Sequence, residues 1–115
     1  NDVLVTSKHI NSKSKKVGDA TKTSTTQFAL DTFSKTTYRA ARYIVAMKEG
    51  TNFHSTEVML VHDGSVVTLT AYGTLKDTDL ATIDADISGS DVRLLVTPAS
   101  ANSTVIKFDR TLVDA

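Results

Sequence analysis

The feature that most constrains this chain is its content of β-branched side chains, which form nearly a third of it. Of its 115 residues, 18 are Thr, 12 are Val and 5 are Ile. These side chains lose rotamer freedom in a helix but pack well on the pleated surface of a sheet. Glu and Arg, which favour helices, number only two and four. The sequence therefore predicts an all-β protein.

Apolar and polar residues alternate in a series of short segments separated by turn-forming residues. The predicted strands lie at 28–33, 41–48, 53–62, 65–73, 80–88, 91–98 and 103–113. Short strands spaced by about 8 to 12 residues are typical of an antiparallel sandwich or barrel. We expect a single antiparallel β-sandwich of about seven or eight strands over residues 25–115. Residues 74–81 are the one place for a hidden helix, and we expect a longer connection there.

The strongest turn signal is Asp63-Gly64, which lies between two alternating runs. A two-residue Asp-Gly loop favours a type I′ turn, in which both central residues have a positive φ. The sequence therefore predicts a tight hairpin at this point.

The predicted core follows from the alternation, but segment 53–62 has two apolar faces. One face carries Met59 and Val61, and the other carries Val58 and Leu60 together with two histidines. We assign the first face to the interior. A shift of one residue would invert this assignment, and the inward face of segment 41–48 is open in the same way. The predicted core consists of Phe28, Leu30, Tyr43, Val45, Met59, Val61, Leu69, Ile83, Ile87, Leu94, Val96, Ile106 and Phe108.

Residues 1–24 are interpreted as an extended basic arm or linker. Residues 1–23 carry a net charge of +3 and the rest of the chain −3, so the formal total is zero. The arm holds one strand-like run, VLVTSKHI at 3–10, followed by a polar stretch with little to bury. We hypothesise that it packs on a neighbouring subunit by strand addition or lysine contacts. The alternative is a flexible linker.

Several partner classes are not expected. Five lysines without arginine or aromatic residues in the arm lack the stacking and bidentate groups of a nucleic-acid site, so no nucleic-acid binding is predicted. No apolar run approaches the roughly 20 residues of a membrane span, so no membrane association is predicted. The chain contains no cysteine, which excludes disulfides and thiolate sites. It begins at Asn1, as a fragment or a processed product would.

The candidate metal ligands of the chain are its histidines and aspartates. His54 and His62 share a strand face but are separated by roughly 26 Å at 3.3 Å per residue, so they cannot share an ion, and His9 lies far away in the sequence. The acidic region Asp77–Asp91 contains Asp77, Asp79, Asp84, Asp86 and Asp91. Its spacing does not match a calcium loop, and a solvated outward face is the favoured interpretation.

No catalytic arrangement emerges from the remaining motifs. Asp84 and Asp86 lie about 6 to 7 Å apart on one strand face, a separation that glycosidase carboxylates also use. Tryptophan platforms for a sugar are absent, however. No nucleophile elbow and no glycine-rich phosphate loop occurs. We therefore expect no enzyme activity and assign no catalytic, cofactor-binding or metal-binding residue.

One resemblance extends over residues 36–111. The order YRAARYIV, HSTEVMLVHDG, AYGTL, LATIDADISG, DVRLLVTP and NSTVIKFDRT resembles a β-domain in virion structural proteins of tailed bacteriophages, among them tail-fibre, neck and baseplate-associated modules. The resemblance implies a non-enzymatic virion component, located in the virion, whose partners are other copies of itself and other virion proteins.

The alternative function is a carbohydrate- or receptor-binding adhesin module that recognises a glycan on the host surface. It predicts that Tyr38, Tyr43 and Tyr72 cluster on the outside of the domain, beside Asp84 and Asp86. Buried tyrosines would argue against it.

Overall fold

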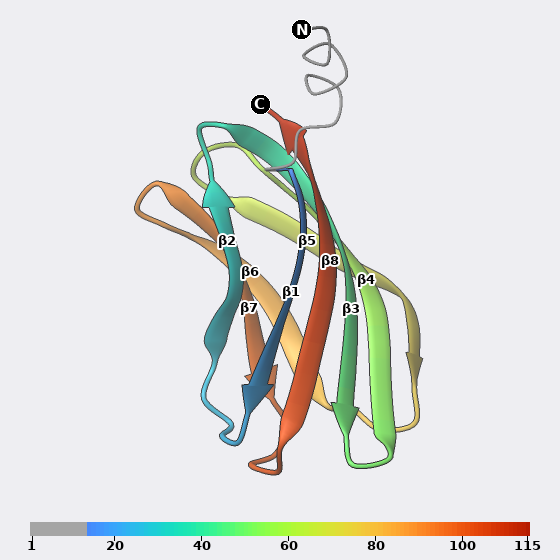
Figure 1. Cartoon of the computed structure of the whole chain (residues 1–115). Coiled ribbons are helices and arrows are strands. Elements are labelled where there is room, and N and C mark those ends of the chain that lie inside the picture. Colours follow the sequence, from blue (N-terminus) through green and yellow to red (C-terminus); the bar gives the residue numbers. More distant parts are fainter. Residues whose placement is uncertain (1–13) are drawn as a thin grey trace, which may run out of the picture.

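A computed structural model describes residues 14–115 as two antiparallel sheets packed face to face (Figure 1). The larger sheet has the strand order β1-β8-β3-β4-β5, and the smaller has the order β2-β7-β6. The prediction of an all-β antiparallel sandwich is confirmed. The strands are β1 Lys15–Lys22, β2 Phe28–Ser34, β3 Tyr38–Glu49, β4 Asn52–His62, β5 Val67–Lys76, β6 Ala81–Ser88, β7 Asp91–Pro98 and β8 Thr104–Asp114.

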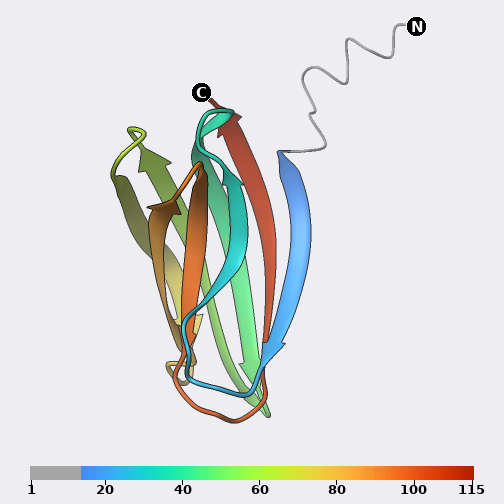
Figure 2. The same ribbon diagram turned by 90° about the vertical axis from the view of Figure 1, so that its left-hand side faces the viewer.

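The core lies between the two sheets, and β3 shows how alternation builds it. Ala41, Tyr43, Val45 and Met47 are buried, whereas the residues between them are exposed. Figure 2 shows the two layers edge-on, with β2 and β7 in one and β1, β3 and β8 in the other. Eleven predicted core residues face this interior. Tyr43, Val45, Leu94, Val96, Ile106 and Phe108 are buried, and Phe28, Leu30, Leu69, Ile83 and Ile87 pack against them at the margin.

The predicted inward face of β4 is wrong. Met59 and Val61 are 50% and 47% exposed, because the opposite face, with Val58 and Leu60, is turned inward. Pairing with β3 fixes this phase, since Val58 lies opposite the buried Tyr43. Burial of the two histidines and Thr56 on the same face is possible because each finds hydrogen-bond partners inside the sandwich.

The connection after β4 is also longer than the predicted two-residue turn. It spans residues 63–66, and Gly64 has a φ of 96°. Within residues 14–115, only glycines have a positive φ, so Asp63 does not have one and the turn is not type I′. The Asp63 carboxylate explains the difference. Its Oδ1 accepts hydrogen bonds from the backbone N–H groups of Ser65 and Val66, at 2.9 and 2.8 Å, and so organises a wider loop.

Replacing Gly64 by Val is expected to lower the free energy of unfolding by at least about 1 kcal/mol, because a β-branched residue is strained at positive φ. Urea unfolding measures the change. Ser65→Val is the matched control, since that residue lies in the same exposed loop without a positive φ. Equal midpoints for Gly64→Val and the parent would contradict the backbone conformation described above.

Part of the sequence assigned to the arm belongs to the sandwich. Residues Lys15–Lys22 form β1, an edge strand that pairs with β8 of the same chain, from Lys15 opposite Thr111 to Lys22 opposite Thr104. The strand-like run at 3–10 lies outside the described residues.

At 74–81 the connection is shorter than expected, because β5 continues to Lys76 and β6 begins at Ala81. No helix within 14–115 is long and apolar enough to cross a membrane.

Candidate functional site

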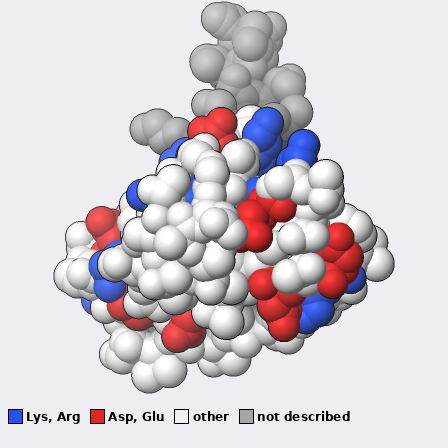
Figure 3. Space-filling view, turned by 90° about the horizontal axis from the view of Figure 1, so that it is seen from below, with Lys and Arg blue, Asp and Glu red and all other residues white. Residues whose placement is uncertain are grey.

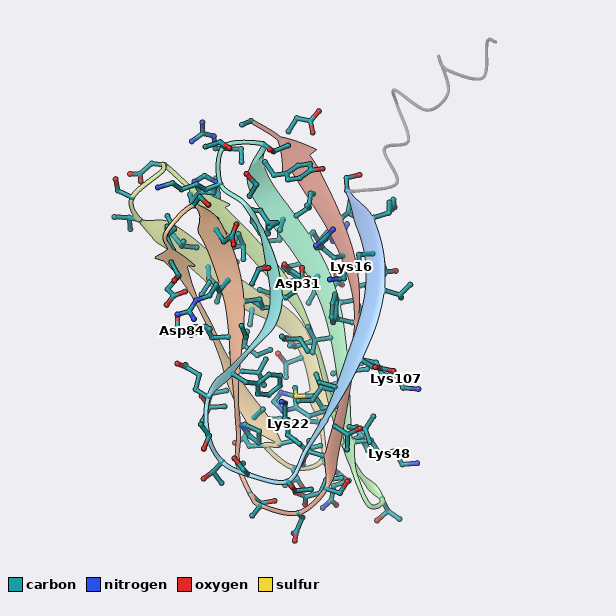
Figure 4. The ribbon with its side chains drawn as sticks, turned by 60° about the vertical axis from the view of Figure 1, so that its left-hand side comes forward. Lys16, Lys22, Asp31, Lys48, Asp84 and Lys107 are labelled. Carbon is teal, nitrogen blue, oxygen red and sulfur yellow. The ribbon has the colours of Figure 1, made fainter. Side chains whose placement is uncertain are left out.

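A buried carboxylate, Asp31, joins the two sheets. A register shift between Ala29 and Asp31 on β2 accompanies the inward position of this side chain, which is fully buried. Its Oδ2 accepts hydrogen bonds from the hydroxyl of Tyr43 and Nη1 of Arg110, both at 2.8 Å, and Oδ1 accepts one from Nζ of Lys16 at 2.9 Å. We call these four residues the Asp31 cluster. Figure 4 shows Asp31 and Lys16 facing each other across the gap between β2 and β1.

The electrostatics of the Asp31 cluster suit a structural role. Burial, together with the charge of Asp31, raises the pKa of Tyr43, so this hydroxyl keeps its proton and donates a hydrogen bond to the carboxylate. Arg110, whose side chain is 8% exposed, supplies the compensating charge. Because the carboxylate is enclosed and accepts three hydrogen bonds from the larger sheet, it is not presented to solvent and instead holds the sheets together.

The sequence-predicted histidines have structural partners. Nε2 of His62 lies 2.7 Å from the carbonyl oxygen of Tyr38, and its Nδ1 accepts a hydrogen bond from the N–H of Gly64 at 2.9 Å. Nδ1 of His54 accepts one from the N–H of Leu80 at 3.1 Å. Both rings lie on the same face of β4, as their spacing predicts, but this face is the inner one and not the outer one that we expected. His9 is outside residues 14–115.

The burial of His54 predicts a pH dependence of stability. Its pKa is lowered, first by burial and then by Lys76. The unfolded chain therefore takes up a proton near pH 6.5 that the folded chain rejects. The free energy of unfolding is expected to fall as the pH drops from about 7 to 5. A smaller fall is expected for His54→Gln, whose amide oxygen can accept the same hydrogen bond.

Chemical denaturation at several pH values checks this prediction. The carboxylates with lowered pKa, such as Asp63 and Asp86, titrate below this window and contribute equally to both proteins. Identical pH profiles for His54→Gln and the parent between pH 5 and 7 would contradict it.

The acidic region does not converge on one point. Asp77 accepts a hydrogen bond from the N–H of Phe53 at 2.9 Å, and Asp79 forms an ion pair with Lys76. Asp86 binds Arg93 through two hydrogen bonds of 2.8 and 2.6 Å, while Asp84 and Asp91 are exposed. Within residues 14–115, no three His, Asp or Glu side chains are grouped as metal ligands. The Asp84–Asp86 pair does share the outer face of β6, as predicted.

The three tyrosines are not brought together. Tyr38 and Tyr43 are 7% and 0% exposed in the core. Tyr72 lies on the larger sheet, away from Asp84 and Asp86 on the smaller one. Its hydroxyl donates to Oε1 of Glu57 at 3.1 Å, and Nη2 of Arg42 donates to the same oxygen at 2.7 Å. These contacts, that of Arg42 first, lower the pKa of Glu57.

The most distinctive surface is a groove of about 590 Å³ on the outer face of the larger sheet, which we call the outer-face groove. Its exposed apolar side chains are Met59, Val61 and Val113, at 47% to 58% exposure. Exposed apolar side chains gathered in a groove offer a surface for contact with another macromolecule. The groove is lined by Lys15, Ala40, Ala41, Arg42, Met59, Leu60, Val61, Thr68, Leu69, Thr70, Thr111 and Val113.

Charge elsewhere on the molecule is mixed. Seen from the end that carries the β3–β4 and β7–β8 turns, acidic and basic groups surround a largely uncharged centre (Figure 3). A nucleic-acid interface would need a continuous basic surface, and this end of the sandwich does not present one.

Sequence reasoning missed both the Asp31 cluster and the outer-face groove. The cluster draws its residues from four strands, β1, β2, β3 and β8. One signal was present, because Arg110 shares the inward phase of Ile106 and Phe108. The groove was missed because Met59 and Val61 were assigned to the core.

Comparison with known proteins reveals similarity of fold. No protein-family model and no curated protein sequence matches the chain. The tailspike protein of Acinetobacter phage vB_ApiP_P1 superposes with a TM-score of 0.58 at 14% identity, over 86% of this chain and 22% of the tailspike. The tailspike of Acinetobacter baumannii phage AM24 gives 0.45 at 8% identity, over 88% of this chain and 26% of that one. The chain therefore spans about a quarter or less of these proteins.

At this level of identity, the comparison with the vB_ApiP_P1 tailspike establishes a shared β-fold only. It shows that a sandwich of this kind occurs as one part of a much longer phage tail protein.

Proposed function

We propose that this β-sandwich is a non-enzymatic structural module of a bacteriophage tail, located in the virion, that acts through contacts between subunits. The observation that carries the proposal is the outer-face groove, where exposed apolar side chains of β4 and β8 lie together in a hollow of the sheet. The fold similarity to part of a phage tailspike and the resemblance of residues 36–111 to virion β-domains support the same conclusion.

The partner that best fits the outer-face groove is a second copy of the module. The chain has a formal net charge of zero, so two copies do not repel each other over long range. The groove is bordered by groups of both signs, since Arg42 and Lys15 lie on its lining and Glu57 binds Arg42. An apolar centre with a mixed-charge rim is the usual anatomy of a protein–protein interface.

The location in the virion is tested by electron microscopy. An antibody raised against the recombinant chain should label the tails of particles of the phage that encodes it. A pre-immune serum is the control. The same antibody should also detect the chain in a denatured lysate of infected host cells. Particles that stay unlabelled although the lysate gives this signal would contradict the proposed location.

The glycan-binding alternative lacks the arrangement that would favour it. Two of its three tyrosines are in the core, and Tyr72 is engaged with Glu57 on the sheet opposite Asp84. A glycan array with the recombinant chain separates the two functions, because only an adhesin module would give specific binding.

A further inference from the structure

Edge strand β1 resembles β5, the other edge strand of the larger sheet, in having no buried residue. None of its eight residues is buried, and Val17 is 79% exposed. Its inward positions carry two small residues, Gly18 and Ala20, and two charged ones, Lys16 and Lys22. β1 is therefore held by its backbone ladder with β8 and by a few contacts of its lysines.

The surface that β1 covers, in contrast, depends on being covered. Gly18 lies against the ring of Phe108, and Lys16 reaches across to the buried carboxylate of Asp31. Lys22 lies over the ring of Phe28, 4.5 Å from its centroid. Loss of β1 would expose the edge of β8 and remove one partner of Asp31. A strand at this edge therefore stabilises the sandwich.

The connection between β1 and β2 allows the strand to come from another chain. Residues 23–27 are all exposed, and they reverse the chain so that Lys22 meets Phe28. Five residues span roughly 17 Å when extended. A chain opened at this hinge can place its β1 on the β8 edge of a neighbour and form the same contacts there. Exchange of an identical element is a low-cost route to assembly.

We propose that β1 is exchanged between copies of this chain, so that in the assembled state the strand at the β8 edge is supplied by a neighbouring subunit. The inference rests on the proposed assembly function. The closed and exchanged forms share their contacts, so the balance is set by the hinge and by the local concentration of chains. High local concentration in a virion favours the exchanged form.

Cysteine cross-linking tests the exchange, because the chain has no cysteine of its own. Val17 and Asp109 are register partners on the outer face. Opposed residues on antiparallel strands have Cα atoms about 4.5 to 5.5 Å apart, within the range of a disulfide. Chains carrying Val17→Cys and size-tagged chains carrying Asp109→Cys are mixed, refolded together from denaturant and oxidised. A 17–109 disulfide then forms only between chains.

The control is a mixture of Val17→Cys with Asp84→Cys, whose second cysteine lies on the outer face of the smaller sheet. We expect the 17–109 product to exceed this collisional background by about tenfold, and its yield to rise with protein concentration. Removing Thr25 and Thr26 should raise the yield of the 17–109 product further, because a shorter hinge cannot bring β1 back onto β8 of its own chain.

A yield equal to the 17–84 background would overturn the exchange, provided that a chain carrying both Val17→Cys and Asp109→Cys forms the intrachain disulfide. This result would leave the proposed location in the tail intact, since antibody labelling of virions does not depend on β1. Unlabelled virions together with efficient 17–109 cross-linking would instead reject the tail location and keep the exchange.

Discussion

Replacing Asp31 by Asn is expected to lower the free energy of unfolding by about 3 to 5 kcal/mol, the usual effect of breaking a buried ion pair. The change leaves the charge of Arg110, whose side chain is 8% exposed, without its carboxylate inside the sandwich. Lys16, at 48% exposure, can turn toward solvent, so Arg110 accounts for most of the loss. Urea unfolding at pH 7 measures the change.

Two further variants separate this effect from a general loss of charge. Asp86→Asn breaks an exposed ion pair with Arg93 and is expected to cost no more than about 1 kcal/mol. Asp31→Leu combined with Arg110→Met removes both buried charges and should recover much of the stability. If Asp31→Asn and Asp86→Asn had equal effects, the Asp31 cluster would not be the link between the sheets.

The second large effect is expected at Gly18. A Cβ atom at this position would lie 2.6 Å from two atoms of the Phe108 ring. The ring has little freedom to move, because it is 5% exposed and packs edge-on against Tyr43 with centroids 5.9 Å apart. Gly18→Ala should therefore lower the free energy of unfolding by about 1 to 3 kcal/mol, as overpacking does.

Hydrogen exchange locates the Gly18→Ala effect. Backbone amides of β1 are expected to exchange faster in the variant than in the parent. Amides of β3, in the centre of the sheet, should exchange only through global unfolding in both proteins. Val17→Ala, on the exposed side of the same strand, is the control and should change stability by less than about 0.5 kcal/mol. A second change, Phe108→Leu, should relieve the clash. Unchanged β1 protection in Gly18→Ala would contradict the close packing of β1 on β8.

The strands and their antiparallel arrangement were predictable because they depend on local pattern. In β3, one face is uniformly apolar and the other carries Arg42 and Lys48 beside Ile44, so the alternation favours the inward face that the structure shows. The positive φ at Gly64 was predictable for the same reason. The loop around it was not, because the two hydrogen bonds of the Asp63 carboxylate favour a wider turn than the dipeptide alone indicates.

The phase of β4 could not be read from its sequence, because both faces of the strand are apolar. The face with Val58 and Leu60 also carries His54 and His62, whose hydrogen-bond partners come from β3 and from the loop segments 63–66 and 77–80. Only the folded chain shows that these polar groups are satisfied inside. The apolar residues of the other face, Met59 and Val61, are then left on the surface.

This second apolar face has a direct bearing on function. A strand needs only one apolar face to build its own sandwich, so Met59 and Val61 are the residues that the proposed contact between subunits would cover. The Asp31 cluster, in contrast, lies wholly inside and explains stability. Sequence reasoning identified neither. The groove depends on the strand order β1-β8-β3-β4-β5, and the Asp31 cluster depends also on the packing of β2 from the smaller sheet against that sheet.

The most direct test of the outer-face groove as a subunit interface is sedimentation equilibrium. It is best made on a chain in which the intrachain 17–109 disulfide keeps β1 in place, so that strand exchange cannot contribute. We expect this chain to self-associate as its concentration rises. The variant with Met59→Lys and Val61→Lys should remain monomeric, whereas Thr82→Lys, on the outer face of β6, should associate like the parent. A parent that stays monomeric, or a lysine variant that associates equally well, would contradict this interface.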